Sequence, residues 1–401
     1  MRKPMSALLL LLAAAATARA QLPTAAPSEV GLDADRLAAI PRLLKDHIDR
    51  KQASGVVTLV ARNGKIAAVH AEGLADIAAG RPMTKDTPFW IASMTKPMAS
   101  VAVMMMVDEG KLSLDDPVGK HIPAFNNVRH KDGKPPARPI TLRHLLTHTS
   151  GVGAPTLDLR GGKATLAEFA DAVAAQPLRF EPGSKWEYGG LTNISVAGRL
   201  VEIASGQEFA AFMAERIFRP LGMADTGFWP DDARRAKISV IYKPGKDKKE
   251  LEPTSVPWIN ARPEDKDRAP NPSGGLFSTA GDVAAFYQML LNGGELNGKR
   301  LLSAKAVQDM TSVHTGDLRS GFVDGSGWGL GLGIVKEPKG VAKSLSAGSF
   351  GHGGAFGTQS WADPKRGMIF ILLVARSGFG NSDGSDLRGA FQDIAVSAVK
   401  E

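Results

Sequence analysis

Segments with the pattern of β-strands lie near both ends of this chain and are separated by a long, mainly helical stretch. Near the N-terminus, residues 56–61 and 66–70 are largely apolar and flank Asn63-Gly64, the dipeptide most typical of tight β-hairpins. Near the C-terminus, the apolar run 368–375 has the pattern of a buried strand and precedes a predicted helix over 385–399. We therefore expect both ends to join in one layer of sheet and helix, with the middle of the chain inserted as a second lobe.

Apolar residues recur at helical spacing in several other segments. We predict helices over 34–50, 94–109, 141–148, 165–175, 190–204 and 281–292. Residues 228–272 are charged, rich in proline and weakly patterned, so the sequence does not indicate their conformation. The expected division is an α/β lobe at about residues 30–88 and 280–400 and a mainly helical lobe at about residues 89–279.

The first twenty residues have the features of a signal peptide. Two basic residues, Arg2 and Lys3, precede an apolar run, and Ala18-Arg19-Ala20 forms a small-residue cleavage site. The run from Ala7 to Ala16 is too short to span a bilayer, which needs about 20 apolar residues. We expect cleavage near Ala20, export to the periplasm or the medium, and no stable membrane anchor.

Composition excludes several classes of function. The chain has no cysteine, so disulfides, thiolate nucleophiles, cysteine-bound zinc and a lipid anchor on cysteine are all impossible. The formal net charge is +8, but part of this excess lies in the predicted leader, and basic residues elsewhere alternate with acidic ones, as in residues 246–250. A basic patch for nucleic-acid binding is therefore not expected.

Two serines have the sequence context of a nucleophile. The first is Ser382 in Gly380-Asn-Ser-Asp-Gly384, which matches G-x-S-x-G between a predicted strand and a predicted helix. The α/β-hydrolase fold that uses this motif places its catalytic histidine after the serine, yet the last histidine here is His352. We therefore interpret the Ser382 segment as a loop that ends in a helix cap.

The second serine is Ser93, which lies three residues before Lys96 at the start of a predicted helix. Residues at this spacing share a helix face, so the lysine amine can reach the serine hydroxyl. Serine needs a neighbouring base, and a buried lysine with a lowered pKa can serve. The helix from Ala99 to Val107 is apolar nearly all round and should be buried, with its methionines filling the core. An S-x-x-K match occurs by chance about once in a chain of this length, so further motifs are needed.

His144 and His148 are four residues apart on a predicted helix, a spacing that suits a zinc pair. No third ligand follows at a recognisable spacing. We therefore expect structural roles for both histidines, and neither a metal nor another cofactor.

Several motifs follow one another in order from about residue 30 to residue 395. They are Phe89 to Pro97, Gly110 to Pro117, Ile140 to Gly151, Gly274 to Thr279, Asn292 to Ser303 and Gly351 to Gly357. In this order the sequence resembles the serine β-lactamase and penicillin-binding-protein superfamily, and it is most similar to the class C β-lactamase-like branch that includes the family VIII carboxylesterases. The resemblance implies one catalytic domain over residues 21–400, with an α+β fold in which helices flank an antiparallel sheet built from both chain ends.

The resemblance also implies an active site of three elements. Ser93 and Lys96 correspond to the nucleophile and its lysine, and Tyr188 corresponds to the tyrosine of a Tyr-x-Asn motif, with Gly190 in place of the asparagine. Tyr188 is one of three tyrosines in the chain and precedes a predicted helix, where its phenol could act as a base near Lys96.

The third element is a Lys-Thr-Gly strand, replaced here by His352-Gly353-Gly354, a version similar to that of esterase-like members. The two glycines allow the backbone to approach the substrate closely, and the backbone N–H groups of Ala355 and Ser93 are implied to form an oxyanion hole.

Three functions are compatible with these residues. We favour a carboxylesterase that forms an acyl-enzyme, because Gly190 lacks the amide, and His352 the fixed positive charge, that lactam-processing members use. The alternative is a β-lactamase or a D-Ala-D-Ala carboxypeptidase. A catalytically silent cell-wall-binding protein is the third possibility, but it would be expected to lack Ser93, Lys96 or Tyr188. The expected partner is thus a small ester, lactam or peptide substrate, and the sequence does not set the oligomeric state.

Overall fold

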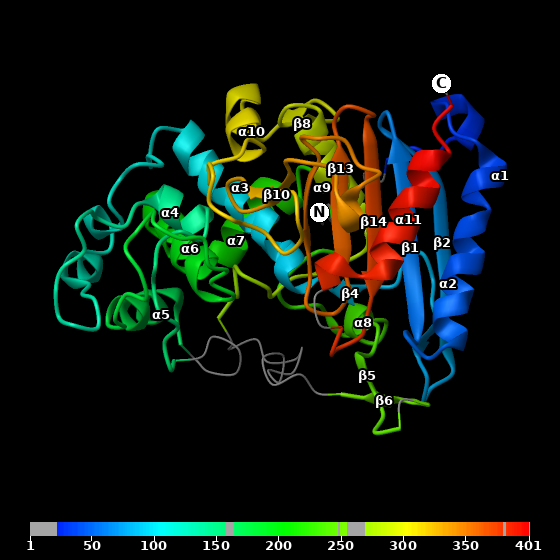
Figure 1. Cartoon of the computed structure of the whole chain (residues 1–401), viewed down its shortest axis with the longest axis horizontal. Helices are drawn as coiled ribbons and strands as arrows, with labels where there is room; N and C mark the ends of the chain where they lie inside the picture. Colours follow the sequence, from blue (N-terminus) through cyan, green and yellow to red (C-terminus); the bar gives the residue numbers. More distant parts are fainter. Residues whose placement is uncertain (1–21, 158–163, 248, 255–268, 380–381, 401) are drawn as a thin grey trace, which may run out of the picture.

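A computed structural model describes residues 22–157, 164–247, 249–254, 269–379 and 382–400 of the chain (Figure 1). The predicted signal peptide, residues 1–20, lies outside the described residues. Within the described ranges, no helix combines the length and the apolar character that crossing a membrane requires.

An antiparallel eight-stranded sheet forms the centre of one lobe, with the strand order β10-β11-β12-β13-β14-β1-β2-β3. Its strands are β1 (Gly55–Arg62), β2 (Lys65–Asp76), β3 (Arg81–Pro82), β10 (Ser326–Trp328), β11 (Gly333–Val335), β12 (Phe350–Gly353), β13 (Gln359–Asp363) and β14 (Met368–Val374). Strands β1 and β14 are neighbours, with Val56 opposite Val374. The prediction that the two chain ends build one sheet is therefore confirmed.

The β1–β2 hairpin has the turn that its sequence predicts. Arg62 pairs with Lys65 across the turn, and both Asn63 and Gly64 adopt positive φ angles, of 52° and 80°. Two such residues in succession are the mark of a type I′ turn, which matches the twist of the strands that it joins.

Helices cover both faces of the sheet. Helices α1 (Ala34–Leu37), α2 (Ala39–Asp49) and α11 (Asp386–Ser397) lie on one side in Figure 1, and α9 (Ala280–Leu291) packs against the other. Alternate residues of β14 belong to two separate apolar clusters: Phe370 and Leu372 pack with α2 and α11, while Ile369 and Ile371 pack with the α9 side. Burial on both faces explains why residues 368–375 form an unbroken apolar run.

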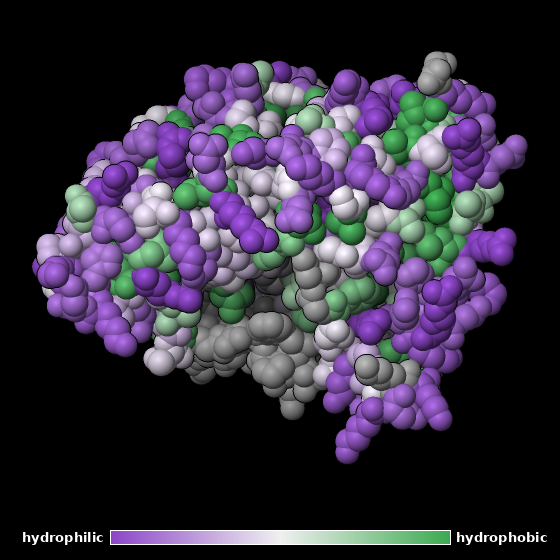
Figure 2. Space-filling model, viewed as in Figure 1, coloured by the Kyte–Doolittle hydropathy of each residue, from purple (hydrophilic) through white to green (hydrophobic). Residues whose placement is uncertain are grey.

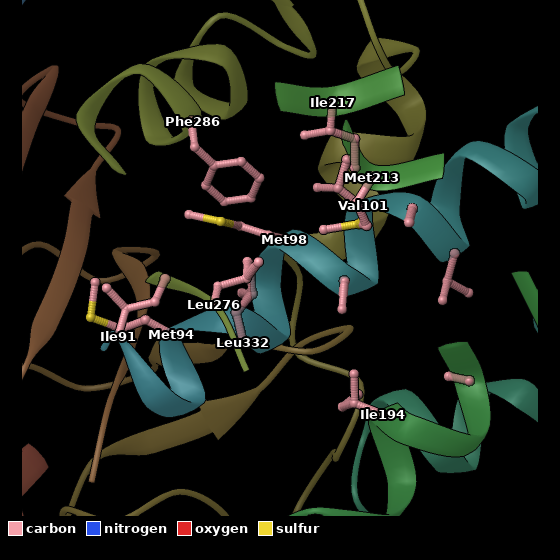
Figure 3. Close-up of a cluster of buried hydrophobic side chains, with 14 of the residues drawn as sticks. Ile91, Met94, Met98, Val101, Ile194, Met213, Ile217, Leu276, Phe286 and Leu332 are labelled. Carbon is pink, nitrogen blue, oxygen red and sulfur yellow. The ribbon is translucent and has the colours of Figure 1, made fainter. Parts of the chain in front are cut away.

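The helical lobe is organised around α3 (Thr95–Asp108), which is buried along most of its length. In Figure 3, Met98 lies next to Phe286 of α9, and Val101 lies next to Met213. The prediction of a buried core helix filled with methionine is therefore confirmed. The other helices outside the sheet layer are α4 (Leu142–Leu146), α5 (Leu166–Ala174), α6 (Thr192–Ser205), α7 (Phe209–Met213), α8 (Asp232–Arg235) and α10 (Ala304–Met310).

Several short strands were not predicted from the sequence. They are β3 and β10 to β13 in the large sheet and the two-stranded pairs β4 (Phe89–Trp90) with β7 (Phe277–Ser278), β5 (Tyr242–Pro244) with β6 (Leu251–Pro253), and β8 (Glu295–Leu296) with β9 (Lys299–Arg300). Half of β12 is glycine, which has a low strand propensity, so neighbouring strands rather than local sequence determine its conformation.

The outer surface is mainly polar. Figure 2 shows hydrophilic residues over most of the visible face. Among the described residues, the large hydrophobic side chains with the greatest exposure are Ile77, Leu157 and Ile203. They lie far apart in the sequence, and isolated apolar residues of this kind are normal on a protein surface.

Candidate active site

Ser93 lies in a tight turn between β4 and α3. The turn is a single 3-10 turn, Ala92–Met94, and α3 begins directly after it. The preceding residue, Ala92, has a φ of 45°, a left-handed conformation that is strained for a residue with a side chain. The strained turn places the half-buried Ser93 at the start of α3. Because α3 is buried, packing fixes the residues around Ser93.

Lys96 lies one helical turn after Ser93, as its spacing predicts. Its Nζ atom lies 3.0 Å from Ser93 Oγ, donates a hydrogen bond of 2.7 Å to the carbonyl oxygen of Ser273, and lies 4.9 Å from the centre of the Tyr188 ring. Lys96 is wholly buried, and burial lowers the pKa of its amine to about 7. Near neutral pH, much of this lysine is therefore an uncharged amine that can accept a proton.

Tyr188 lies just before α6 and beside both residues. Burial raises the pKa of its phenol well above the ordinary value, and this effect outweighs that of the side-chain hydrogen bond with Ser93, which lowers the pKa. The phenol thus keeps its proton near neutrality. Of the two groups beside Ser93, the Lys96 amine rather than the Tyr188 phenol has a pKa suited to accepting the serine proton.

His148 also lies at this site, although the sequence predicts only a structural role for it. Its ring centre is 4.7 Å from that of Tyr188, and its Nδ1 accepts hydrogen bonds from the backbone N–H of Gly189 and from Asn193 Nδ2. Because Nδ1 accepts, the ring proton must be on Nε2. Burial and the nearby Lys96 keep the pKa of His148 well below its usual value, so the ring is neutral. Its φ of 57° is a second strained backbone position.

Asn193, three residues after Gly190, supplies a side-chain amide near this site. Its Oδ1 accepts a hydrogen bond of 2.7 Å from Ser150 Oγ, and its Nδ2 lies 2.9 Å from His148 Nδ1. A Cβ atom on Gly189 would lie 2.3 Å from that nitrogen. Both ends of the amide are thus bonded within the protein, and Asn193 orients His148 rather than replacing the missing asparagine.

His352 lies on β12 and faces the Tyr188 ring, with 6.0 Å between the ring centres. Its Nδ1 donates a hydrogen bond of 2.6 Å to the carbonyl oxygen of Gly353, so Nε2 carries a free electron pair. That Nε2 is buried and has no partner among the described residues. Burial and the charge of Lys96 lower the pKa of His352 to about 3. At this position the site therefore offers a neutral acceptor and no positive charge.

The backbone after His352 approaches the Ser93 turn closely. A Cβ atom on Gly354 would lie 2.5 Å from the carbonyl oxygen of Ile91, so only glycine fits there. Gly354 N–H donates to the carbonyl of Thr358. Across the described part of the chain, nothing accepts a hydrogen bond from the exposed Ala355 N–H. This donor is therefore available for a bound oxyanion.

Aromatic rings from distant segments surround Tyr188. The ring centres of Phe322 and Tyr188 are 4.7 Å apart, and those of Trp186 and Trp328 are 5.2 Å apart. The Trp328 ring centre lies 5.4 Å from that of His148 and 5.4 Å from that of His352. Phe322 and Trp328 also line a pocket that reaches His352 and Gly353. No sequence pattern predicts this cluster, because Phe322 and Trp328 reach Tyr188 only in the fold.

The remaining sequence candidates form hydrogen bonds with the backbone. Ser382 Oγ donates a hydrogen bond to the carbonyl of Gly354, so this serine contacts the strand beside the site without a base of its own. His144 Nδ1 accepts from the backbone N–H of Thr141 and thereby caps α4. No three His, Asp or Glu side chains of the described ranges are grouped so that they could hold a metal ion.

Comparisons with known proteins point to one family. The family model described as Beta-lactamase matches residues 40–393 of this chain. Esterase EstB from Burkholderia gladioli is 32% identical over 378 residues, which cover 87% of this chain and 93% of that protein. Penicillin-binding protein 4 from Amycolatopsis lactamdurans is 32% identical over 311 residues, which cover 76% of either chain. The solved structure of EstCE1, described as a hydrolase with promiscuous acyltransferase activity, has a TM-score of 0.80 at 26% identity and covers 92% of this chain and 99% of its own.

Proposed function

The chain belongs to the β-lactamase family, and we propose that within this family it is a carboxylesterase that hydrolyses small neutral esters through an acyl-enzyme on Ser93. The observation that carries the ester assignment is the neutral His352, which occupies the place of a lysine in lactam-processing members. A fixed cation at this place would bind a substrate carboxylate, whereas a neutral acceptor suits an uncharged substrate. Esterase EstB as a relative supports the same assignment.

The first half-reaction forms the acyl-enzyme. Ser93 Oγ attacks the ester carbonyl carbon while its proton passes to the uncharged amine of Lys96, 3.0 Å away. The carbonyl electron pair moves onto oxygen, and the backbone N–H groups of Ser93 and Ala355 stabilise the resulting oxyanion. When the oxyanion collapses, the bond to the alcohol oxygen breaks, and the Lys96 proton reaches that oxygen through the Tyr188 hydroxyl.

The second half-reaction repeats these steps with water. A water molecule gives one proton to the Tyr188–Lys96 pair as its oxygen attacks the acyl carbon, and the same oxyanion position is used again. Collapse breaks the bond to Ser93 Oγ, which regains a proton from Lys96. The products are a carboxylic acid and free enzyme, so atoms and charge balance over the cycle.

A β-lactamase or D-Ala-D-Ala carboxypeptidase is the second candidate. The similarity to penicillin-binding protein 4 and the presence of Ser93, Lys96 and Tyr188 favour it. The substrate amide, however, would meet Gly190 instead of a side-chain amide, and Asn193 is already bonded to Ser150 and His148. We therefore place this candidate after the esterase. The third candidate, a silent cell-wall-binding protein, is disfavoured by the short Ser93–Lys96 distance.

Export is part of the proposal, because residues 1–20 have the pattern of a cleavable leader. N-terminal sequencing of the protein recovered from the periplasm or medium should begin near Gln21. Recovery of the whole chain from the cytoplasm with Met1 or Arg2 at its N-terminus would refute this part of the proposal.

The test of the proposed activity compares two substrates and two serine variants. Purified protein is assayed with a short p-nitrophenyl ester and with a chromogenic cephalosporin, alongside Ser93→Ala and Ser382→Ala. We expect ester turnover that Ser93→Ala abolishes and that Ser382→Ala only reduces. Cephalosporin turnover orders of magnitude faster than ester turnover would favour the lactamase instead. Ester turnover that survives in Ser93→Ala would remove Ser93 as the nucleophile.

A further inference from the structure

The sequence motif around Ser382, which resembles a nucleophile elbow, lies directly beside the oxyanion strand. Ser382 Oγ donates a hydrogen bond of 2.9 Å to the carbonyl oxygen of Gly354. The carboxylate of the next residue, Asp383, accepts a hydrogen bond from the backbone N–H of Gly353. Two consecutive side chains thus hold two peptide groups of the segment that leads to Ala355, and the Gly354 carbonyl belongs to the same peptide group as the Ala355 N–H.

These two side chains are themselves fixed. Ser382 is 8% exposed, and Gln359 donates side-chain hydrogen bonds to both Asp383 and Ser382. The orientation of the Gln359 amide is determined, because its Oε1 accepts a hydrogen bond of 2.9 Å from Trp361 Nε1. Its nitrogen must therefore face the serine and the aspartate.

A buried arginine holds Asp383 from the other side. Arg388 of α11 is 1% exposed, donates a hydrogen bond of 2.6 Å from Nη1 to the backbone carbonyl of Asp383, and lies with that atom 3.9 Å from Asp383 Oδ1. Its guanidinium lies 4.0 Å from the centre of the Trp361 ring. The positive charge of Arg388 compensates the negative charge of the buried carboxylate. Asp383 thus links Arg388 of α11 to Gly353 of β12.

The glycines of this segment explain why such support is needed. Gly353 and Gly354 have no side chains that packing could hold, and a Cβ atom on Gly353 would lie 2.5 Å from Asp383 Oδ1. An oxyanion donor works only when it is held within about 0.5 Å of its productive position. Within the turn, Gly354 N–H donates to the Thr358 carbonyl and Gly357 N–H donates to the Gly354 carbonyl. The hydrogen bonds from Ser382 and to Asp383 add to these in fixing the Ala355 N–H.

We propose that Ser382 and Asp383 are positioning residues that hold the Gly353–Ala355 backbone in the geometry of an oxyanion hole. This inference rests on the proposed function, since it assigns the residues to support of the reaction at Ser93. Ser382 itself takes no part in bond making. Its hydroxyl acts through the hydrogen bond that it donates to the Gly354 carbonyl, and the Asp383 carboxylate acts through the one that it accepts from the Gly353 N–H.

The test compares Ser382→Ala with Ser397→Ala, a matched control at the end of α11. Ser397 Oγ also donates to a backbone carbonyl, that of Ile394, at 2.8 Å. Each variant is assayed for ester kcat and KM, and for the affinity of phenylboronic acid, which forms a tetrahedral adduct on a nucleophilic serine. All rates are divided by the concentration of active sites titrated with a fluorophosphonate, so misfolded protein does not count.

For Ser382→Ala we expect kcat to fall about tenfold with little change in KM, and the boronate affinity to fall by a similar factor, against about 10²–10³ for outright loss of an oxyanion donor. Ser382→Thr, which keeps a hydroxyl, should recover most of the loss. Asp383→Asn should lower kcat further than Ser382→Ala does. The new amide N–H would face the N–H donor of either Gln359 or Gly353, and Arg388 would lose its counter-charge.

Ser382→Ala that matches Ser397→Ala in both kcat and boronate affinity would overturn the proposal. So would a fall in kcat with unchanged boronate affinity, because the oxyanion geometry would then be intact. A failure of the proposed function is recognised separately, since phenylboronic acid would then bind Ser93→Ala as well as it binds the unchanged protein.

Discussion

Ser93 and Ser382 offer a direct comparison between two regions of the molecule. Each serine follows a strand and precedes a helix, Ser93 between β4 and α3 and Ser382 between β14 and α11. Yet the Ser93 hydroxyl lies 3.0 Å from a buried amine, whereas the Ser382 hydroxyl donates to a carbonyl oxygen. The comparison teaches that the neighbouring base, and not the match to a motif, decides which serine can be a nucleophile.

The two regions also differ in whether their buried cation has a carboxylate partner. Lys96 has no carboxylate partner among the described residues, and burial lowers the pKa of its amine to about 7. Arg388 is equally buried but lies beside Asp383, and the pKa of its guanidinium falls only to about 10. A buried cation without a counter-charge gives up its proton near neutrality, whereas a paired one keeps its charge and serves structure.

Of the changes that test this comparison, removal of the Lys96 amine should have the largest effect on kcat. Lys96→Ala deletes the group that accepts the Ser93 proton, so we expect kcat for a p-nitrophenyl ester to fall about 10³-fold or more. Lys305→Ala, which removes an exposed lysine paired with Asp309 on α10, is the control and should leave kcat unchanged. Equal kcat values for the two variants would show that Lys96 is not the base.

Removal of the Tyr188 hydroxyl should have the second-largest effect on kcat. Tyr188→Phe keeps the ring contacts with His148 and Phe322 but removes the relay to the leaving alcohol, and we expect kcat to fall about 10²-fold. Tyr242→Phe is the control, because its hydroxyl accepts a hydrogen bond from the backbone N–H of Ile77, away from the site. A Tyr188→Phe variant that keeps full kcat would exclude a role for the hydroxyl in proton transfer.

The pH dependence should report Lys96 directly. Because burial lowers the pKa of this amine to about 7, its uncharged form increases as the pH rises through that value, and kcat/KM should rise with it. Below the midpoint, we expect a loss of about tenfold per pH unit. The neighbouring His352 has a pKa lowered to about 3 and His148 is neutral, so neither produces this midpoint. A flat profile between pH 5.5 and 8.5, a range of about 3 units, would contradict the assignment.

A change at His148 should have the smallest effect. His148→Asn tolerates the positive φ but removes the Nδ1 acceptor and the ring beside Tyr188, so we expect a loss of about tenfold in kcat and of about 1–2 kcal/mol in the free energy of unfolding. His144→Asn should change stability alone, because His144 only caps α4. Urea unfolding and ester assays of both variants measure the difference, and an unchanged kcat for His148→Asn would reduce this residue to a structural role.

Much of the fold follows from local patterns in the sequence. The hairpin at Asn63-Gly64, the buried run of β14 and the apolar helix α3 each have a strong periodic or turn signal, and each is confirmed. Strands β10 to β13 could not be predicted, because all four are short and β10 to β12 contain glycine, so they acquire their conformation from neighbours in the sheet.

The site was only partly predictable for a related reason. Ser93 and Lys96 lie one helical turn apart, so sequence spacing alone brings them together. His148 and Trp328 reach Tyr188 only through tertiary packing, and no spacing predicts that contact. The position of His148 next to Thr149-Ser150-Gly151, within a motif that carries the family resemblance, was the one signal that could have identified it.

The most direct test of the central claim is to find which serine reacts. The unchanged protein is treated with a fluorophosphonate near pH 8, digested, and mapped by mass spectrometry for the modified residue. The account predicts a single modification on Ser93, with Ser382 unmodified. Modification of Ser382, or of no serine at all, would contradict it.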